Sequence, residues 1–162
     1  ICPITDKKAR GVIAESKDTM HVYHLDNDTY EVVYSFGWYL KKMIDEADSC
    51  LTLSRPGATL RYGHEVCVLP LACLMELDSY GLATDNLEQL DKMGWRCYDI
   101  FPMACNVQMV FYRHKNAKKD MLVKVLLNEN EARLPLTPVT GNYYRWADVR
   151  KYYLDKLAAF SL

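Results

Sequence analysis

The sequence lacks two features that would indicate a nucleic-acid or membrane partner. Its 20 basic and 21 acidic residues leave a formal net charge of −1, whereas general nucleic-acid binders carry a basic excess or stripe. Long apolar runs are also missing. The longest, from Val66 to Met75, contains Pro70 and is too short to cross a bilayer. We therefore expect neither nucleic acid nor a membrane as a partner.

Metal-binding patterns are scarce as well. The six cysteines form no CxxC pair and no cluster with zinc-ligand spacing, so we expect no metal, no cofactor and mostly buried thiols acting as small hydrophobes. His21 and His24 form an HxxH pair, which we interpret as surface or lining residues in preference to a metal site. A disulfide is conceivable in an exported protein, but the spacing selects no pairing.

What is present suits one domain with a substantial core, since half of the 162 residues are hydrophobic. There is no initiator methionine and no leader, which suggests a processed chain or a fragment. The order of periodic segments predicts an α/β layer with an antiparallel hairpin at its edge. The predicted elements are a strand at 20–23, a turn at 26–28, a helix at 31–50, a strand at 58–62, a buried helix at 65–77, a surface helix or turn at 85–93, hairpin strands at 106–112 and 121–127, an extended run at 134–139, and a helix at 147–160 capped by Asp148.

The stretch from Arg61 to Glu65 combines a cation, a histidine and a carboxyl group between a predicted strand and a predicted buried helix. Ligands bind at such junctions in open α/β sheets, and a helix start attracts anions. Glu65 could protonate a leaving oxygen, His64 could stabilise a phosphoryl oxygen, and Arg61 could add a bidentate contact. The alternative is structural, with Glu65 favoured by the helix dipole and His64 a turn residue.

A longer run of sequence resembles a known family. The stretch from Thr59 to Glu65 is similar to the second signature of the histidine acid phosphatases, and more narrowly of the multiple inositol polyphosphate phosphatases. Residues 31–160 resemble the C-terminal portion of that family. The segments that carry the resemblance are Thr59 to Glu65, Leu69 to Met75, Phe101 to Gln108, Phe111 to Arg113, Val123 to Glu129, and Tyr143 to Val149.

The resemblance implies a fold and roles for the site residues. Residues 31–162 would be the C-terminal part of a three-layer α/β/α phosphatase domain, and residues 1–30 would border its helical subdomain. The family writes its second motif as His-Asp or as His-Ala-Glu. Here His64 would contact the phosphoryl group, and Glu65, in the acid position of the His-Asp form, would be the proton donor. Arg61 would bind substrate, and the parent protein would be periplasmic or secreted.

The family's nucleophile motif, Arg-His-Gly-x-Arg-x-Pro, is absent from this chain. The only Arg-His pair, Arg113-His114, lacks the glycine, the second arginine and the proline. Covalent catalysis needs that activated nucleophile, so two hypotheses stand. The chain is the C-terminal part of a phosphomonoesterase, inactive without its N-terminal segment, or it is a truncated non-catalytic module that binds phosphate or a partner. Either form would expose a sheet edge, so we expect self-association or a companion segment.

Overall fold

The computed structural model describes residues 22–25, 29–32, 35–64, 67–82, 84, 89–114 and 120–159. The first two of these ranges are the strands β1 (Val22–Leu25) and β2 (Thr29–Val32), which pair antiparallel. The predicted strand at 20–23 is thus confirmed two residues later. The predicted turn at 26–28 lies outside the described residues.

The predicted helix at 31–50 begins later than expected. Helix α2 spans Ser35–Leu51, and residues 31–32 belong to β2 instead. The sequence of β2, Thr-Tyr-Glu-Val, is rich in β-branched and aromatic residues. These residues favour a strand once a partner such as β1 supplies hydrogen bonds.

An antiparallel sheet forms the second half of the chain. The predicted hairpin is confirmed as β3 (Val107–Tyr112) and β4 (Leu122–Leu127), paired from Val107↔Leu127 to Tyr112↔Leu122. Two short strands that were not predicted, β5 (Asn130–Ala132) and β6 (Tyr144–Arg145), also pair with β4. Their shortness explains the omission, because two or three residues show no periodicity.

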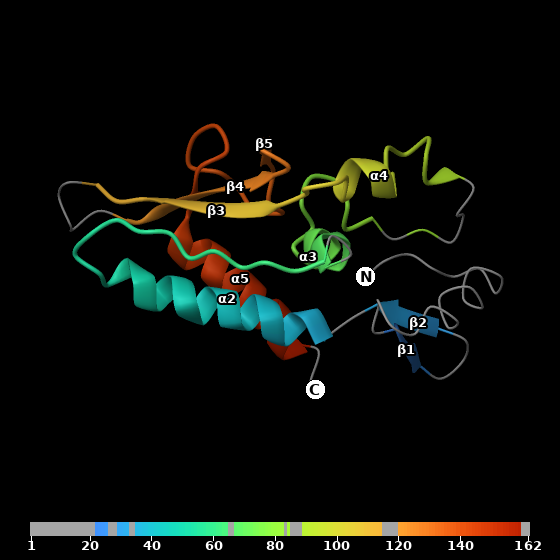
Figure 1. Cartoon of the computed structure of the whole chain (residues 1–162), viewed down its shortest axis with the longest axis horizontal. Helices are drawn as coiled ribbons and strands as arrows, with labels where there is room; N and C mark the ends of the chain where they lie inside the picture. Colours follow the sequence, from blue (N-terminus) through green and yellow to red (C-terminus); the bar gives the residue numbers. More distant parts are fainter. Residues whose placement is uncertain are drawn as a thin grey trace.

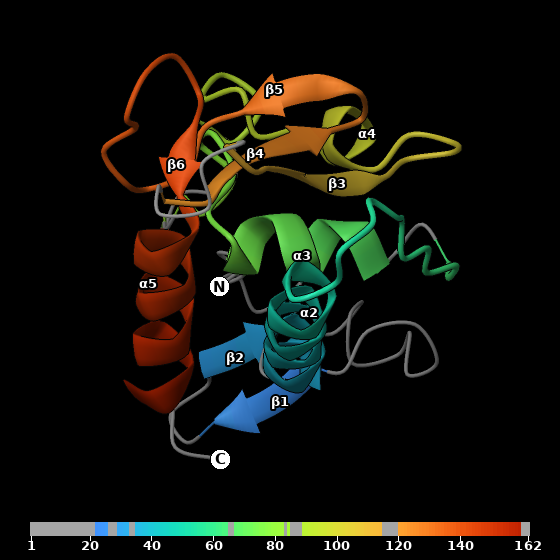
Figure 2. The ribbon, with the colours of Figure 1, turned by 90° about the vertical axis from the view of Figure 1, so that its left-hand side faces the viewer.

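Helices lie against one face of this sheet, below it in both Figures 1 and 2. They are α2, α3 (Val68–Leu74) and α5 (Trp146–Ala159). Alternate residues of β4 face them and are buried, as the period of a strand requires. The core joins Leu40 and Ile44 of α2, Leu69 to Leu74 of α3, Val123, Val125 and Leu127 of β4, and Val149 and Tyr153 of α5. The domain is therefore mixed α/β with an open antiparallel sheet.

Helix α3 is shorter than the predicted helix at 65–77 but as deeply buried as expected. Pro70 is its third residue, so it lies in the first turn, where a missing N–H costs little. The chain leaves the helix after Met75, and Glu76 adopts a left-handed conformation with φ of 53°. Lys156 of α5 donates to the Leu74 carbonyl at 2.8 Å and satisfies one of the terminal acceptors.

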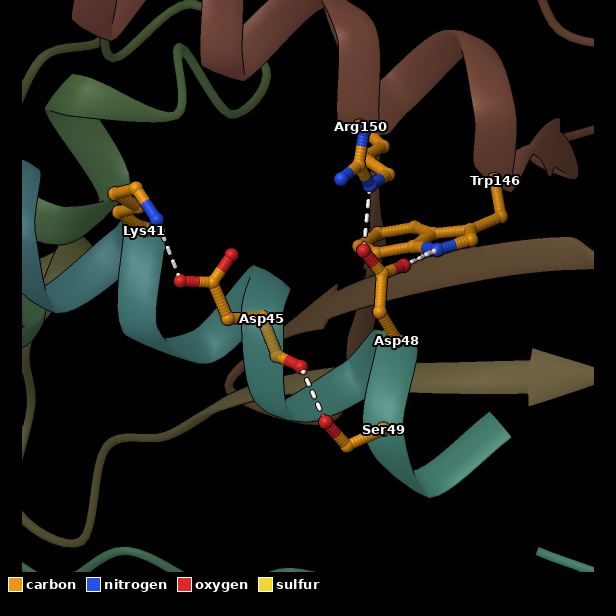
Figure 3. A network of polar contacts seen from close by, with 6 residues as sticks. All are labelled: Lys41, Asp45, Asp48, Ser49, Trp146 and Arg150. Atoms are coloured by element: carbon orange, nitrogen blue, oxygen red, sulfur yellow. Dashed lines mark hydrogen bonds and ion pairs between the residues drawn. The ribbon is translucent and has the colours of Figure 1, made fainter. Parts of the chain in front are cut away.

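Asp48 joins α2 to α5, as Figure 3 shows. One carboxylate oxygen accepts a hydrogen bond of 2.7 Å from the indole Nε1 of Trp146, and the other accepts one of 2.5 Å from Arg150 Nε. Trp146 is buried and begins α5. The sequence predicted a helix from residue 147, one residue after its observed start at Trp146. It was wrong about Asp148, which lies in the first turn of α5 and does not cap it.

The remaining predictions are partly wrong and partly outside the described residues. The extended run at 134–139 forms no strand, residues 85–88 lie outside the described residues, and 89–94 contain turns. A one-turn helix, α4 (Cys97–Ile100), was not predicted. The expectation of mostly buried cysteines is wrong, since Cys50 and Cys97 are exposed and only Cys73, of the five in the described part, is buried.

Candidate functional site

The predicted site lies on the segment that connects α2 to α3. Residues 52–60 of this segment are all exposed, including Leu60 at 70%, and Tyr62 is 91% exposed. The strand predicted at 58–62 is not formed. An extended segment becomes a strand only when a neighbour takes its backbone hydrogen bonds, and none of the described strands does so. Figure 1 shows residues 52–64 as an unpaired trace passing between α2 and the sheet.

Arg113 fixes the beginning of this segment. Its guanidinium donates to the carbonyl oxygen of Leu53 at 3.1 Å and to that of Leu51 at the end of α2. The Leu51 carbonyl is an orphan acceptor of the helix C-terminus, where a cation is favoured, and Leu53 lies two residues beyond that end. Arg113 therefore ties the end of β3 to the end of α2. The adjacent His114 is exposed, and Arg113 uses its guanidinium to bind these two carbonyl oxygens.

Arg61 is anchored in the middle of the segment. Its guanidinium forms an ion pair with the carboxylate of Glu46 on α2 and lies 5.3 Å from the ring centroid of Tyr39. The arginine side chain is 25% exposed and the glutamate 40%. The cation is attracted both to the face of the aromatic ring and to the carboxylate. A substrate anion at Arg61 would have to compete with Glu46.

His64 is exposed at the end of the segment, and its carbonyl oxygen accepts a hydrogen bond of 3.0 Å from the Cys67 N–H. This contact turns the chain into α3, which starts at Val68. Helix α3 therefore begins three residues after the predicted start at residue 65, and Pro70 lies in its first turn. Glu65, the predicted proton donor, lies outside the described residues.

Asn106, which lies in one of the family-like segments, has a structural role. Its backbone N–H donates to Asn128 Oδ1 at 3.1 Å, and Asn128 in turn donates to the carbonyl oxygens of Asp99 and Ile100. Gln108 and Asn106 also donate to Glu129. Sequence reasoning missed Asn128, whose φ of 51° suits the turn between β4 and β5. The signal was an asparagine directly after an apolar strand.

A second cluster of polar side chains connects the end of α3 to α5. Tyr152 donates to the Glu76 carboxylate, and Lys156 Nζ lies 3.0 Å from the same oxygen. Burial, followed by the hydrogen bond to Glu76, raises the pKa of Tyr152 to about 12. Tyr153 donates to the Met75 carbonyl at 2.7 Å, and burial raises the pKa of its phenol strongly. These groups stabilise the fold and lie on different elements from the predicted site.

The part of the chain that the structure describes contains no group of three or more metal-ligating side chains. His24 lies in β1, whereas His21 falls outside that part. Among the same residues, no helix has the length and apolar character needed to span a bilayer.

The domain is thus a mixed α/β unit with an open antiparallel sheet, and its histidine motif precedes a buried helix. Its fold is similar to the crystal structure of the multiple inositol polyphosphate phosphatase from Bifidobacterium longum in complex with inositol hexasulfate, with a TM-score of 0.64 and 25% sequence identity. The likeness covers 75% of this chain and 26% of that one, so the chain spans about a quarter of that protein's length. No family model and no curated protein sequence matches the chain.

Proposed function

We propose that this chain supplies the acid half of a histidine-type phosphomonoesterase site, which acts in the complete protein on phosphorylated inositol or similar esters. The observation that carries the proposal is the fold likeness to an inositol polyphosphate phosphatase over 75% of the chain. The ordered motifs, from Thr59 to Glu65 onward, support it independently.

The chemistry assigns one step to each residue. His64 donates a hydrogen bond to a phosphoryl oxygen while the ester P–O bond breaks, and Glu65 gives its proton to the leaving alcohol. The phosphoryl group passes to a histidine nitrogen supplied by another segment. Water then cleaves the P–N bond and releases phosphate. The exposure of His64 is compatible with substrate contact.

Substrate binding by Arg61 requires an exchange of partners. In the free chain its guanidinium is paired with Glu46. A phosphate carries more negative charge than one carboxylate and accepts a bidentate guanidinium contact, so it would compete for Arg61. The Tyr39 ring at 5.3 Å would keep the guanidinium plane ordered during the exchange.

The proposal also requires a nucleophile and further sheet strands from outside this chain. The complete domain would be a three-layer α/β/α sheet, and the nucleophile would come from a segment that this chain does not contain. The parent protein would act in the periplasm or outside the cell. The second candidate is a truncated, non-catalytic phosphate-binding or interaction module, which the absence of the nucleophile motif favours.

Turnover distinguishes the two candidates. We expect the isolated chain to hydrolyse neither a generic phosphomonoester nor inositol hexakisphosphate at mildly acidic pH. Turnover that Glu65→Ala abolishes would refute the non-catalytic candidate. The gene gives a further criterion, because an Arg-His-Gly-x-Arg-x-Pro motif encoded upstream of Ile1 supports the enzyme. A gene without one excludes it.

Binding tests the role of His64 directly. Inositol hexasulfate is a suitable probe, because its sulfate esters report anion binding without phosphoryl transfer. In a calorimetric titration we expect weak saturable binding that His64→Ala reduces several-fold. The matched control is His114→Ala, which removes an exposed histidine outside the motif. Equal losses in both variants would contradict the assignment of His64.

A further inference from the structure

Glu46 and Tyr39 contact the same guanidinium group. They lie seven residues apart on α2, and seven residues make almost two full turns, so both side chains leave the helix on one face. Arg61 reaches this face from the segment that follows α2. Its Nη2 donates to Glu46 Oε2, and its guanidinium carbon lies 5.3 Å from the centre of the Tyr39 ring. All three side chains belong to this chain, so the arrangement requires no segment from outside it.

The two contacts differ in how easily an anion would replace them. A single hydrogen bond joins Arg61 to Glu46, and both side chains remain in contact with solvent. Such an ion pair is weak, because water and salt screen the charges and two long side chains lose rotamer freedom. Tyr39 is partly buried against the core and attracts the cation through its ring face. Glu46 is therefore the partner that a competing anion would displace, while Tyr39 stays in place.

A phosphate or sulfate ester suits the guanidinium better than Glu46 does in this geometry. Such an anion presents two oxygens to two N–H groups of the planar fork, whereas Glu46 accepts one hydrogen bond. The incoming anion must still break the contact between Arg61 and Glu46 before it binds. The need to release Glu46 therefore lowers the net affinity of this position for any anion.

We propose that Glu46 is a specificity-determining residue, which competes with the substrate for Arg61 and so sets the anion affinity of this position. The inference rests on the proposed function for the identity of the anion, a phosphate ester that reaches Arg61. Glu46 selects for an anion that can form paired hydrogen bonds, because an anion with a single contact gains no advantage over the carboxylate. Neutralising Glu46 should therefore strengthen anion binding. An ion pair with a purely structural role predicts a less stable chain and no gain in affinity.

Calorimetric titration of this chain with inositol hexasulfate measures the competition. We expect Glu46→Gln, which keeps the size of the side chain but removes its charge, to lower the dissociation constant about three- to tenfold. Asp45→Asn is the matched control, because it removes the same charge from the neighbouring position of α2, where Asp45 pairs with Lys41. That variant should bind the probe like wild type. Urea unfolding of each variant checks that a change in affinity does not reflect a loss of the fold.

A double-mutant cycle tests whether the gain arises at Arg61. We expect Arg61→Gln to weaken binding, and adding Glu46→Gln to that variant should give no gain. Should Arg61→Gln not fold, the comparison of Glu46→Gln with Asp45→Asn still decides the question.

Four outcomes overturn the proposal. They are an affinity that Glu46→Gln leaves unchanged or lowers, an equal gain in Asp45→Asn, a gain that persists without Arg61, and a lack of binding in both wild type and Glu46→Gln. None of them decides the phosphatase proposal, which depends on turnover and on the motif upstream of Ile1. Conversely, a gene without that motif would remove the catalytic role and leave the effect of Glu46→Gln on affinity measurable.

Discussion

Removing the Asp48 carboxylate should destabilise the contact between α2 and α5. Two donors converge on this group, Trp146 Nε1 at 2.7 Å and Arg150 Nε at 2.5 Å (Figure 3). They differ in burial, since Trp146 is 6% exposed, whereas the Asp48 and Arg150 side chains are 34% and 44% exposed. Leaving a buried indole N–H without an acceptor lowers the stability of the folded protein by about 1–3 kcal/mol. A solvent-exposed ion pair contributes far less because water and salt screen it.

The unsatisfied indole N–H of Trp146 should therefore account for most of the lost stability. We expect Asp48→Ala to lower the free energy of unfolding by about 2 kcal/mol. Asp48→Asn keeps an oxygen that can accept from Trp146 Nε1, so it should lose less than half as much. Arg150→Ala should leave the unfolding midpoint close to wild type, because its partner stays hydrated and bonded to the indole.

Urea unfolding followed by tryptophan fluorescence measures these differences. Asp45→Ala is the matched control, because Asp45 lies on the same helix and its side chain forms an exposed ion pair with Lys41 at 2.6 Å. That variant should match wild type within error. The reasoning would be refuted by an Asp48→Ala variant as stable as the Asp45→Ala control. A loss from Arg150→Ala equal to that from Asp48→Ala would refute it as well.

Three further outcomes are expected. Arg113→Lys, which cannot hold two carbonyls in the same fork, should cost about 1 kcal/mol in urea unfolding and increase amide exchange at the end of α2. Asn128→Gly tolerates the left-handed backbone but loses three side-chain hydrogen bonds, so its free energy of unfolding should fall by about 2 kcal/mol. An unchanged free energy of unfolding would contradict the role of the Asn128 side chain. Tyr152 has a folded pKa of about 12 against an ordinary value of 10, so its contribution to stability is complete below pH 10 and is lost as the pH rises toward 12. The absorbance titration curve of Tyr152→Phe should lack one phenol ionisation near pH 12 that the wild-type curve contains. If the ionisation that the variant lacks lies nearer pH 10, the burial argument is contradicted.

Local sequence patterns were enough to predict the longer elements. The hairpin, α2 and α5 each contain enough residues for a period of two or of 3.6 to be visible, and each was found within a few residues of its predicted bounds. The apolar run after His64 likewise predicted a buried helix, and α3 is that helix. The motif from Thr59 to Glu65 led to the phosphatase family, with which the fold likeness agrees.

Only the tertiary structure decided which segments found partners. Residues 58–62 have strand-like sequence, yet none of the described strands takes their hydrogen bonds, whereas the two residues of β6 form a strand because they pair with β4. The pairings of Arg61 with Glu46 and of Asp48 with Trp146 join residues 15 and 98 positions apart. Periodicity reports which face of an element is apolar, but pairing depends on which elements the complete fold brings together. The sequence therefore determined the elements and the histidine motif, and tertiary packing determined that Arg61 is held by Glu46 and that Asp48 accepts from Trp146.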